Sequence, residues 1–119
     1  MPAPLKLASR LAQAVSEANS VYRQYATSEP GRAWATMTND EQRDVLLAVA
    51  RTLELRTASA EECHAEWLKH REAAGWKYAE VMNPEKKESP YMMPWEQLKP
   101  EGKAKSELYL AILKPFYGV

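Results

Sequence analysis

The residues that decide the fold are 38–55, TNDEQRDVLLAVARTLEL. They open with Thr38 and Glu41 at the spacing of a capping box, in which hydroxyl and carboxylate satisfy exposed amides at the start of a helix. An apolar stripe then follows at helical spacing, formed by Val45, Leu46, Val49 and Leu53. Because residues 45–50 carry no charge, we expect this helix to be central and buried on most sides.

Helices are also predicted on both sides of this stretch. Residues 5–25 place apolar side chains three and four positions apart, and the turn-forming stretch 27–31 follows them. Ser59 and Glu62 repeat the capping-box spacing and begin a third helix. Gly75 is expected to end that helix as a left-handed cap.

Residues 76–99 form a different kind of segment, interrupted by prolines and rich in tryptophan and tyrosine. The aromatic side chains argue against disorder, so we expect an ordered loop in which a short hairpin can form. Pro100 suits the first turn of a last helix, and Pro115 is expected to end it. The predicted fold class is therefore all-α: a small bundle of about four helices, with an ordered aromatic and proline-rich loop between helices 3 and 4.

The bulk composition excludes several classes of protein. Sixteen basic residues balance sixteen acidic ones, so no overall positive field would hold DNA or RNA. No apolar run approaches the length of a membrane span, and the first ten residues lack the apolar core of a signal peptide. With a single cysteine, Cys63, no intrachain disulfide can form. These features predict one domain in the cytoplasm, without membrane contact.

Catalytic and metal-binding chemistry finds little support in the sequence. Cys63 and His64 are neighbours on a helix and point about 100° apart, so they cannot act as nucleophile and base. His64 and His70 are separated by about 120° around the same helix and cannot share a metal. Glycine-rich phosphate-binding motifs and the Gly-x-Ser-x-Gly motif are absent. We therefore expect no enzyme, no metal and no cofactor.

A short pattern occurs twice: a tryptophan followed three residues later by an apolar residue, just before a helix. The two pairs are Trp34 with Met37, and Trp95 with Leu98. The repetition suggests a duplicated helix pair. In such an arrangement, a cleft would form between the first and third helices, and its lining would be Asn19, Tyr22, His64 and Arg71.

The second half of the chain carries a longer motif. Its elements are His64-x-x-Trp67, Arg71, Gly75-Trp76-x-Tyr78, Lys87-x-x-Pro90 and Met93-Pro94-Trp95-x-x-Leu98. In order and spacing these residues resemble the signature of the ryanodine receptor repeat, the RyR domain. The resemblance implies one RyR-like domain over residues 1–119, with an N-terminal helix pair at 5–57 and a signature half at 58–119. It is similar to stand-alone members of the family from bacteriophages and bacteria.

The resemblance implies ligand recognition without catalysis, with a nucleotide or nucleotide-derived signal as the ligand. For a phage protein, it implies capture of a host defence signal. Aromatic rings would stack on the base, at about 1–3 kcal/mol per base, and Arg71 and Lys87 would meet the phosphates. The candidate ligand-binding residues are Asn19, Tyr22, His64, Trp67, Arg71, Trp76, Tyr78, Lys87, Pro90 and Trp95.

Other interpretations stay open. Structural roles are simpler for Trp67 in the core, for His64 as a hydrogen-bonded histidine, and for Lys87 as a solvated charge. An exposed patch at Tyr91-Met92-Met93 would instead indicate a protein-interaction module or a homo-oligomer. The chain also departs from the family's usual residues at Ser16, Ala79, Ser89 and Ser106. If those positions contact the ligand, this protein binds a different one or none.

Overall fold

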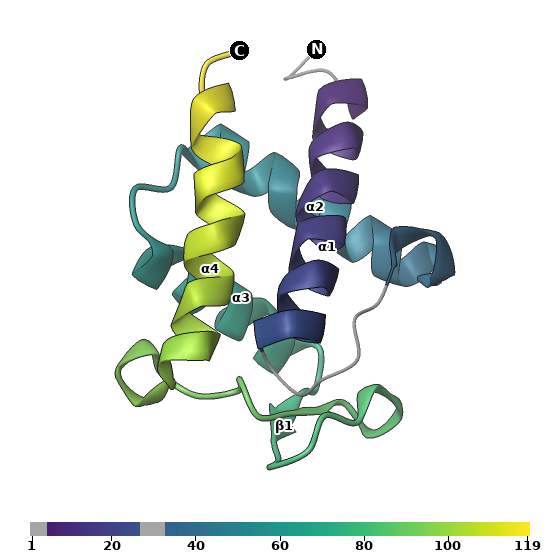
Figure 1. Ribbon diagram of the computed structural model, residues 1–119, viewed down its shortest axis with the longest axis vertical. Helices are drawn as coiled ribbons and strands as arrows, with labels where there is room; N and C mark the ends of the chain where they lie inside the picture. The colour runs from purple at the N-terminus through teal and green to yellow at the C-terminus, as the bar shows by residue number, and fades with distance from the viewer. Residues whose placement is uncertain (1–4, 27–32) are drawn as a thin grey trace.

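The computed structural model describes residues 5–26 and 33–119, and Figure 1 shows their arrangement. Within these ranges the helices are α1 (Leu5–Ala26), α2 (Asn39–Leu55), α3 (Ala60–Ala73) and α4 (Pro100–Leu113). Short 3-10 turns are η1 (Trp34–Thr36), η2 (Pro84–Lys86), η3 (Trp95–Gln97) and η4 (Lys114–Phe116), and two-residue strands are β1 (Lys77–Tyr78) and β2 (Glu88–Ser89). The all-α bundle predicted from the sequence is confirmed, whereas the turn predicted at 27–31 lies outside the described residues.

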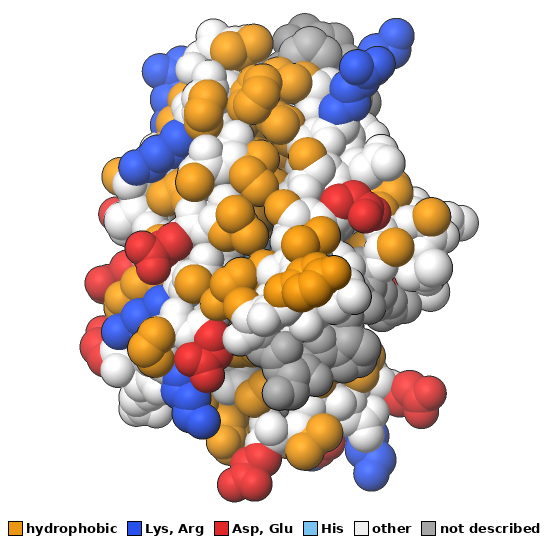
Figure 2. All heavy atoms as spheres, in the orientation of Figure 1, with side chains coloured by type: hydrophobic (Ala, Val, Ile, Leu, Met, Phe, Trp, Pro, Cys, Tyr) orange, Lys and Arg blue, Asp and Glu red, His pale blue; other side chains and the backbone are white. Residues whose placement is uncertain are grey.

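The core forms where α1 packs against both α2 and α4 (Figure 1). Its buried members are Ala8, Leu11, Ala12, Val15, Val49, Leu53 and Leu113. Ala8 and Ala12 lie one turn apart on α1 and are essentially inaccessible to solvent, so their small side chains allow close approach of the neighbouring helix. Figure 2 shows apolar side chains following α1 and α4 down the middle of this face, with most charges towards its edges.

Helix α2 is less buried than its sequence indicates. Val49 and Leu53 are buried, but Leu47 is 60% exposed and Leu55 is 53% exposed. The expectation of burial on most sides is therefore wrong. An uncharged run over residues 45–50 covers more than one full turn, so part of it faces solvent wherever only one side of the helix is packed.

The two predicted capping boxes differ in their outcome. At α2 the box is complete: Thr38 Oγ1 accepts from Glu41 N at 3.1 Å, and Glu41 Oε1 accepts from Thr38 N at 2.9 Å. At α3 only half of it forms, because Ser59 Oγ accepts from Glu62 N at 3.2 Å while the Glu62 carboxylate accepts from Ala58 N. The start of α3 is still capped by two hydrogen bonds.

The segment between α3 and α4 contains a parallel strand pair, and the short hairpin expected there is reduced to a single antiparallel bridge between Asn83 and Glu88. Lys77 pairs with Glu88 and Tyr78 with Ser89, both in parallel register. Between the strands the chain turns at η2 and at Lys87, which is left-handed (φ 55°). It therefore enters β2 running in the same direction as β1.

Both ends of α4 lie at the predicted prolines. Pro100 is in the first turn of α4, and α4 ends at Leu113, two residues before Pro115. The chain then passes directly into η4, and Pro115 lies near the start of this turn, where its missing N–H costs no hydrogen bond.

The repeated tryptophan pattern corresponds to a repeated local structure. In both η1 and η3 the residue three positions after the tryptophan donates its N–H to the tryptophan carbonyl, at 3.1 Å in each case. The flanking residues Ala33 and Pro94 are both extended, with ψ of 146° and 154°. Each turn delivers the chain directly into the next helix, α2 or α4. The duplication is therefore present at this local level.

Gly75 ends α3 with φ +93°, the left-handed conformation predicted for it. Replacing Gly75 by Ala should destabilise the protein by about 1 kcal/mol, because a Cβ is unfavourable in this conformation. Urea unfolding followed by circular dichroism measures the change. Gly75→Asn is the matched control and should lose less stability, since asparagine tolerates left-handed backbone. An equal loss of stability in both variants would contradict this explanation.

Candidate ligand-binding site

The candidate site begins on one side of α3. His64, Trp67 and Arg71 follow one another at three and four residues, so their side chains lie on the same side of the helix. His64 is buried, whereas Trp67 and Arg71 are half-buried. This side of α3 faces the segment that carries Trp76 and Trp95.

Arg71 lies between two indoles. Its guanidinium carbon is 5.6 Å from the ring centre of Trp67 and 4.7 Å from that of Trp76. Trp76 can reach it because Gly75 turns the chain back and Trp76 N donates to the Arg71 carbonyl at 2.9 Å. Cation–π contacts contribute about 0.5–1 kcal/mol at exposed positions and more where water is excluded. The two indoles therefore hold the guanidinium in one place.

The electrostatic environment of Arg71 combines burial with nearby acids. Burial lowers the pKa of Arg71, while Asp44 and Glu41 on α2 act in the opposite direction. The guanidinium stays protonated, because an arginine side chain is not deprotonated in proteins. The result is a permanent cation with less bound water than a surface arginine has.

His64 joins α3 to the loop. Its side chain is 4% exposed, and Nε2 lies 2.6 Å from the Met93 carbonyl oxygen. Because a carbonyl oxygen can only accept, Nε2 carries the proton and donates it. The His64 ring also lies 5.5 Å from Trp67, nearly parallel to it, and 6.1 Å from Trp95.

These contacts form a continuous series from α4 to the end of α3. We call it the aromatic ladder, and its members in order are Lys103, Trp95, His64, Trp67, Arg71 and Trp76. Lys103 Nζ is 5.5 Å from the Trp95 ring centre, so a cation also stands near the α4 end. Beside the ladder, Lys105 Nζ lies 3.8 Å from the Tyr91 ring centre.

Three further predicted residues belong to the segment that follows α3. Lys87 Nζ donates to the Ala74 carbonyl at 2.7 Å, so it closes the C-terminus of α3. Tyr78 is 52% exposed and Pro90 is half-buried. Lys87 thus already has a partner, which leaves Arg71 as the stronger candidate for an anionic group.

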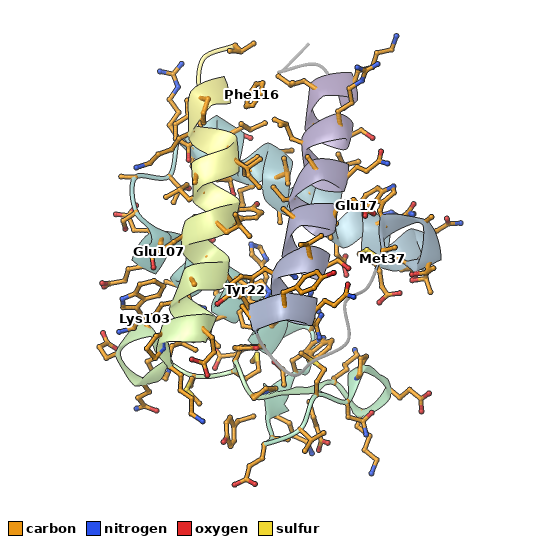
Figure 3. The ribbon with its side chains drawn as sticks, in the orientation of Figure 1. Glu17, Tyr22, Met37, Lys103, Glu107 and Phe116 are labelled. Carbon is orange, nitrogen blue, oxygen red and sulfur yellow. The ribbon has the colours of Figure 1, made fainter. Side chains whose placement is uncertain are left out.

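The two predicted residues of α1 lie apart from the ladder's contacts. Tyr22 OH donates to the Glu101 carbonyl at 2.9 Å and connects the end of α1 to the start of α4 (Figure 3). Burial raises the pKa of Tyr22, and Glu101 adds to the effect. Asn19 is half-buried one turn earlier. The structure therefore brings together His64, Trp67, Arg71, Trp76 and Trp95, and gives Tyr22 a separate role between helices.

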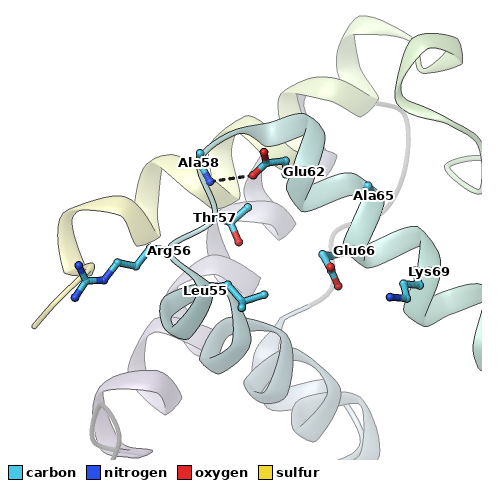
Figure 4. A pocket seen from close by; sticks show the side chains of 8 residues that line it. All are labelled: Leu55, Arg56, Thr57, Ala58, Glu62, Ala65, Glu66 and Lys69. Atoms are coloured by element: carbon cyan, nitrogen blue, oxygen red, sulfur yellow. Dashed lines mark hydrogen bonds between the residues drawn. The ribbon is translucent and has the colours of Figure 1, made fainter.

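Two hollows border α3, and neither is the cleft predicted between the first and third helices. One, of about 240 Å³, lies between α3 and η3 and includes His64 and Trp95 in its lining. The other, of about 500 Å³, lies at the corner between α2 and α3 (Figure 4). Of the predicted site residues, His64 and Trp95 alone line these two hollows.

Lys103 was not among the residues predicted for the site, although the sequence carried a signal for it. Lys103 follows Trp95 by eight residues, as Gln42 follows Trp34. In the structure, both side chains contact the tryptophan eight positions earlier: Gln42 Nε2 donates to the Trp34 carbonyl at 2.8 Å, and Lys103 lies over the Trp95 ring. The repeat therefore identifies positions with a common geometry and different chemistry.

Comparison with known proteins gives one positive finding: a family model, that of the RyR domain, matches residues 32–116. The chain belongs to the RyR domain family. Comparison with curated proteins and with solved structures gave no match. The matched range of this RyR domain contains the whole aromatic ladder and both tryptophan turns, while α1 precedes it.

The positions where this RyR domain departs from the usual family residues have different surroundings. Ser89 is fully buried, and its Oγ accepts from Tyr91 N at 3.1 Å, so it is a turn-forming residue. Ser16, Ala79 and Ser106 are half-buried. The expectation of an exposed Tyr91-Met92-Met93 patch is wrong, because Met92 is 8% exposed and Tyr91 packs on Gly102 of α4.

Two further structural features bear on function. Among residues 5–26 and 33–119, no helix has the length and apolar character needed to cross a membrane. In the same ranges, no three or more histidine, cysteine, aspartate or glutamate side chains are grouped so that they could bind a metal ion.

Cys63 points towards the packed side of α3, where it is partly buried near Tyr109 and Tyr117. Burial raises the pKa of Cys63 to about 11, with Glu62 adding to the effect. Burial also raises the pKa of Tyr109 to about 12, although its hydroxyl shares a 3.1 Å hydrogen bond with Thr52. The thiol is therefore protonated at neutral pH.

These raised pKa values predict a loss of stability in alkali. The unfolded chain releases the Cys63 proton near pH 9, whereas the folded protein retains it to about 11, so the free energy of unfolding should fall across this range. Cys63→Ala should show a shallower fall than the unsubstituted protein between pH 9 and 11, and a parallel profile from pH 7 to 8. Urea unfolding at each pH measures this, and identical slopes would contradict the assignment.

Proposed function

We propose that this RyR domain is a non-catalytic receptor for a nucleotide or nucleotide-derived signal, bound at the Arg71 end of the aromatic ladder. The observation that carries the proposal is the placement of Arg71 between Trp67 and Trp76. A guanidinium is a planar fork of donors that matches phosphate oxygens, and its hydrogen bonds to phosphate are among the stronger ones in proteins.

The indoles support the proposal in two ways. They fix the guanidinium, so less side-chain entropy is lost when a phosphate binds. They also remain half-buried themselves, as Trp67 and Trp76 each keep some accessible surface, and Tyr78, two residues after Trp76, is about half exposed. A base stacked on such a ring gains about 1–3 kcal/mol.

The acidic residues near Arg71 favour a specific kind of ligand. Asp44 and Glu41 lie close enough to influence the Arg71 pKa, and because Glu41 already accepts from Thr38 N, Asp44 is the stronger candidate for contact with a ligand. Carboxylates accept hydrogen bonds from sugar hydroxyls and exocyclic amines but repel phosphate. A ligand with a polar sugar or base edge next to a single anionic group therefore fits this end better than a polyphosphate does.

A binding role, rather than a catalytic one, is favoured by the surroundings of His64 and Cys63 on α3. The His64 Nε2 proton is donated to the Met93 carbonyl inside a stack of rings. The Cys63 thiol is protonated at neutral pH because its pKa is about 11. We further propose that the protein acts in the cytoplasm, and that a phage-encoded copy would sequester a host defence signal.

Isothermal titration against mononucleotides, cyclic dinucleotides and ADP-ribose derivatives tests the proposal. Arg71→Gln should weaken binding of the best ligand by about tenfold to a hundredfold, as expected for the loss of a hydrogen bond to a charged group. The affinity of the Arg71→Lys variant should lie between those of the unsubstituted protein and Arg71→Gln, because lysine keeps the charge without the planar fork. If no member of the panel gives a heat of binding, the proposed function is refuted.

Arg43→Gln is the matched control, since Arg43 is an exposed arginine on α2. It should leave affinity unchanged apart from a small effect of net charge. Circular dichroism of each variant establishes that the fold is intact. Equal weakening by the Arg43 and Arg71 substitutions would show that binding follows net charge and that the ligand does not contact Arg71.

A further inference from the structure

A second surface of α3 lies away from Arg71 and differs from the ladder in chemistry. The two hollows beside α3 both have Ala65 and Lys69 in their lining, so they lie next to each other along the helix. We call the two together the outer groove. Its central part is formed by Glu61, His64, Ala65, Leu68, Lys69 and Glu72 of α3 together with residues 94–96.

The floor of the outer groove is apolar. Leu68 and Trp95 are half-buried and Pro94 is exposed, so they present apolar surface at the η3 end. Leu55, 53% exposed, does the same at the corner between α2 and α3 (Figure 4). An extended or helical segment lying along α3 would contact apolar surface at both ends.

The rim of the groove is acidic. Glu61, Glu72 and Glu96 are exposed, and their carboxylates have no hydrogen bond or ion pair among the residues that the structure describes. Lys69 is the one cation among the residues that line this central part, against those three carboxylates, while Lys103 lies over the Trp95 ring without being part of the lining. Because the whole chain has a formal net charge of zero, this local surplus of negative charge is not a property of the surface in general.

At the corner hollow the acids are already engaged. Glu66 Oε2 lies 3.5 Å from Arg51 Nε and 3.7 Å from His70 Nε2. Glu62 accepts a hydrogen bond from Ala58 N. The carboxylates able to receive a new cation are therefore those near Trp95, not those at the corner.

We propose that the outer groove is a docking surface for a basic, apolar-anchored peptide segment of a partner protein. The charge complementarity selects this occupant: lysine and arginine lay apolar stems along a surface while their charged tips reach carboxylates. A phosphate-bearing ligand would meet three carboxylates here, so the groove does not compete with the nucleotide site. The inference therefore stands independently of the proposed function.

The expected strength of peptide binding follows from the exposure of the carboxylates at the rim. Each exposed ion pair contributes little and is screened by salt. Binding should therefore be weak to moderate and should decrease as the salt concentration rises. The apolar contacts at Leu68 and Trp95 would fix the position of the segment, while the charges favour basic partners over others.

The test uses the full chain labelled with ¹⁵N and a blocked peptide of the repeating sequence Ala-Arg-Leu. Addition of peptide should shift the amide signals of Ala65, Leu68 and Lys69 and the indole N–H of Trp95. The Trp76 indole N–H should not move. A peptide with glutamate in place of arginine is the negative probe and should leave all these signals unchanged.

A triple substitution, Glu61→Gln with Glu72→Gln and Glu96→Gln, should weaken binding of the arginine peptide about tenfold. The matched control is Glu54→Gln with Glu80→Gln and Glu107→Gln, which removes the same charge from exposed positions elsewhere and should change affinity less than threefold.

Three outcomes would overturn the inference. These are an absence of shifts, shifts confined to residues outside the groove, and equal weakening by the two triple variants. Concentration-dependent shifts of the groove signals without peptide would mean that a second copy of the chain occupies the surface instead. None of these results would alter nucleotide titrations, so failure here is distinct from failure of the proposed function.

Discussion

The hydrogen bond from His64 to the Met93 carbonyl is the contact on which the rest of the site depends. It joins the middle of α3 to the end of an irregular segment that has only a two-residue strand pair of its own. The bond lies in a buried, ring-lined environment, where an unsatisfied carbonyl would be costly. By fixing Met93 it places η3, and with it Trp95, against α3.

Around that contact α3 separates two kinds of surface. On one side, Arg71 and Lys103 stand at aromatic rings as fixed cations. On the other, Glu61, Glu72 and Glu96 surround an apolar groove. Trp95 contributes to both sides, since it belongs to the ladder and also lines the groove. One short helix in an electrically neutral chain can therefore offer sites of opposite charge, because its residues project in every direction at 3.6 per turn.

Much of the fold was predictable because its signals are local. The complete capping box at Thr38, the left-handed Gly75 and the helix-opening Pro100 each depend on a few neighbouring residues. Burial was harder to predict. Leu47 is exposed because it lies on α2, which has one packed side, whereas Met92 is buried because its loop folds onto α3 and α4. Apolar character alone cannot report which neighbours a segment will meet.

The sequence by itself determined the helices, the repeated tryptophan pattern and the family, since these follow from spacing along the chain. It also indicated that His64, Trp67 and Arg71 share one side of a helix. Only the tertiary structure decided that Arg71 lies between two indoles, that Lys87 closes a helix end, and that Lys103 reaches Trp95. Those contacts depend on the path of residues 76–99, and a path without periodic hydrogen bonding is fixed by long-range packing rather than by local pattern.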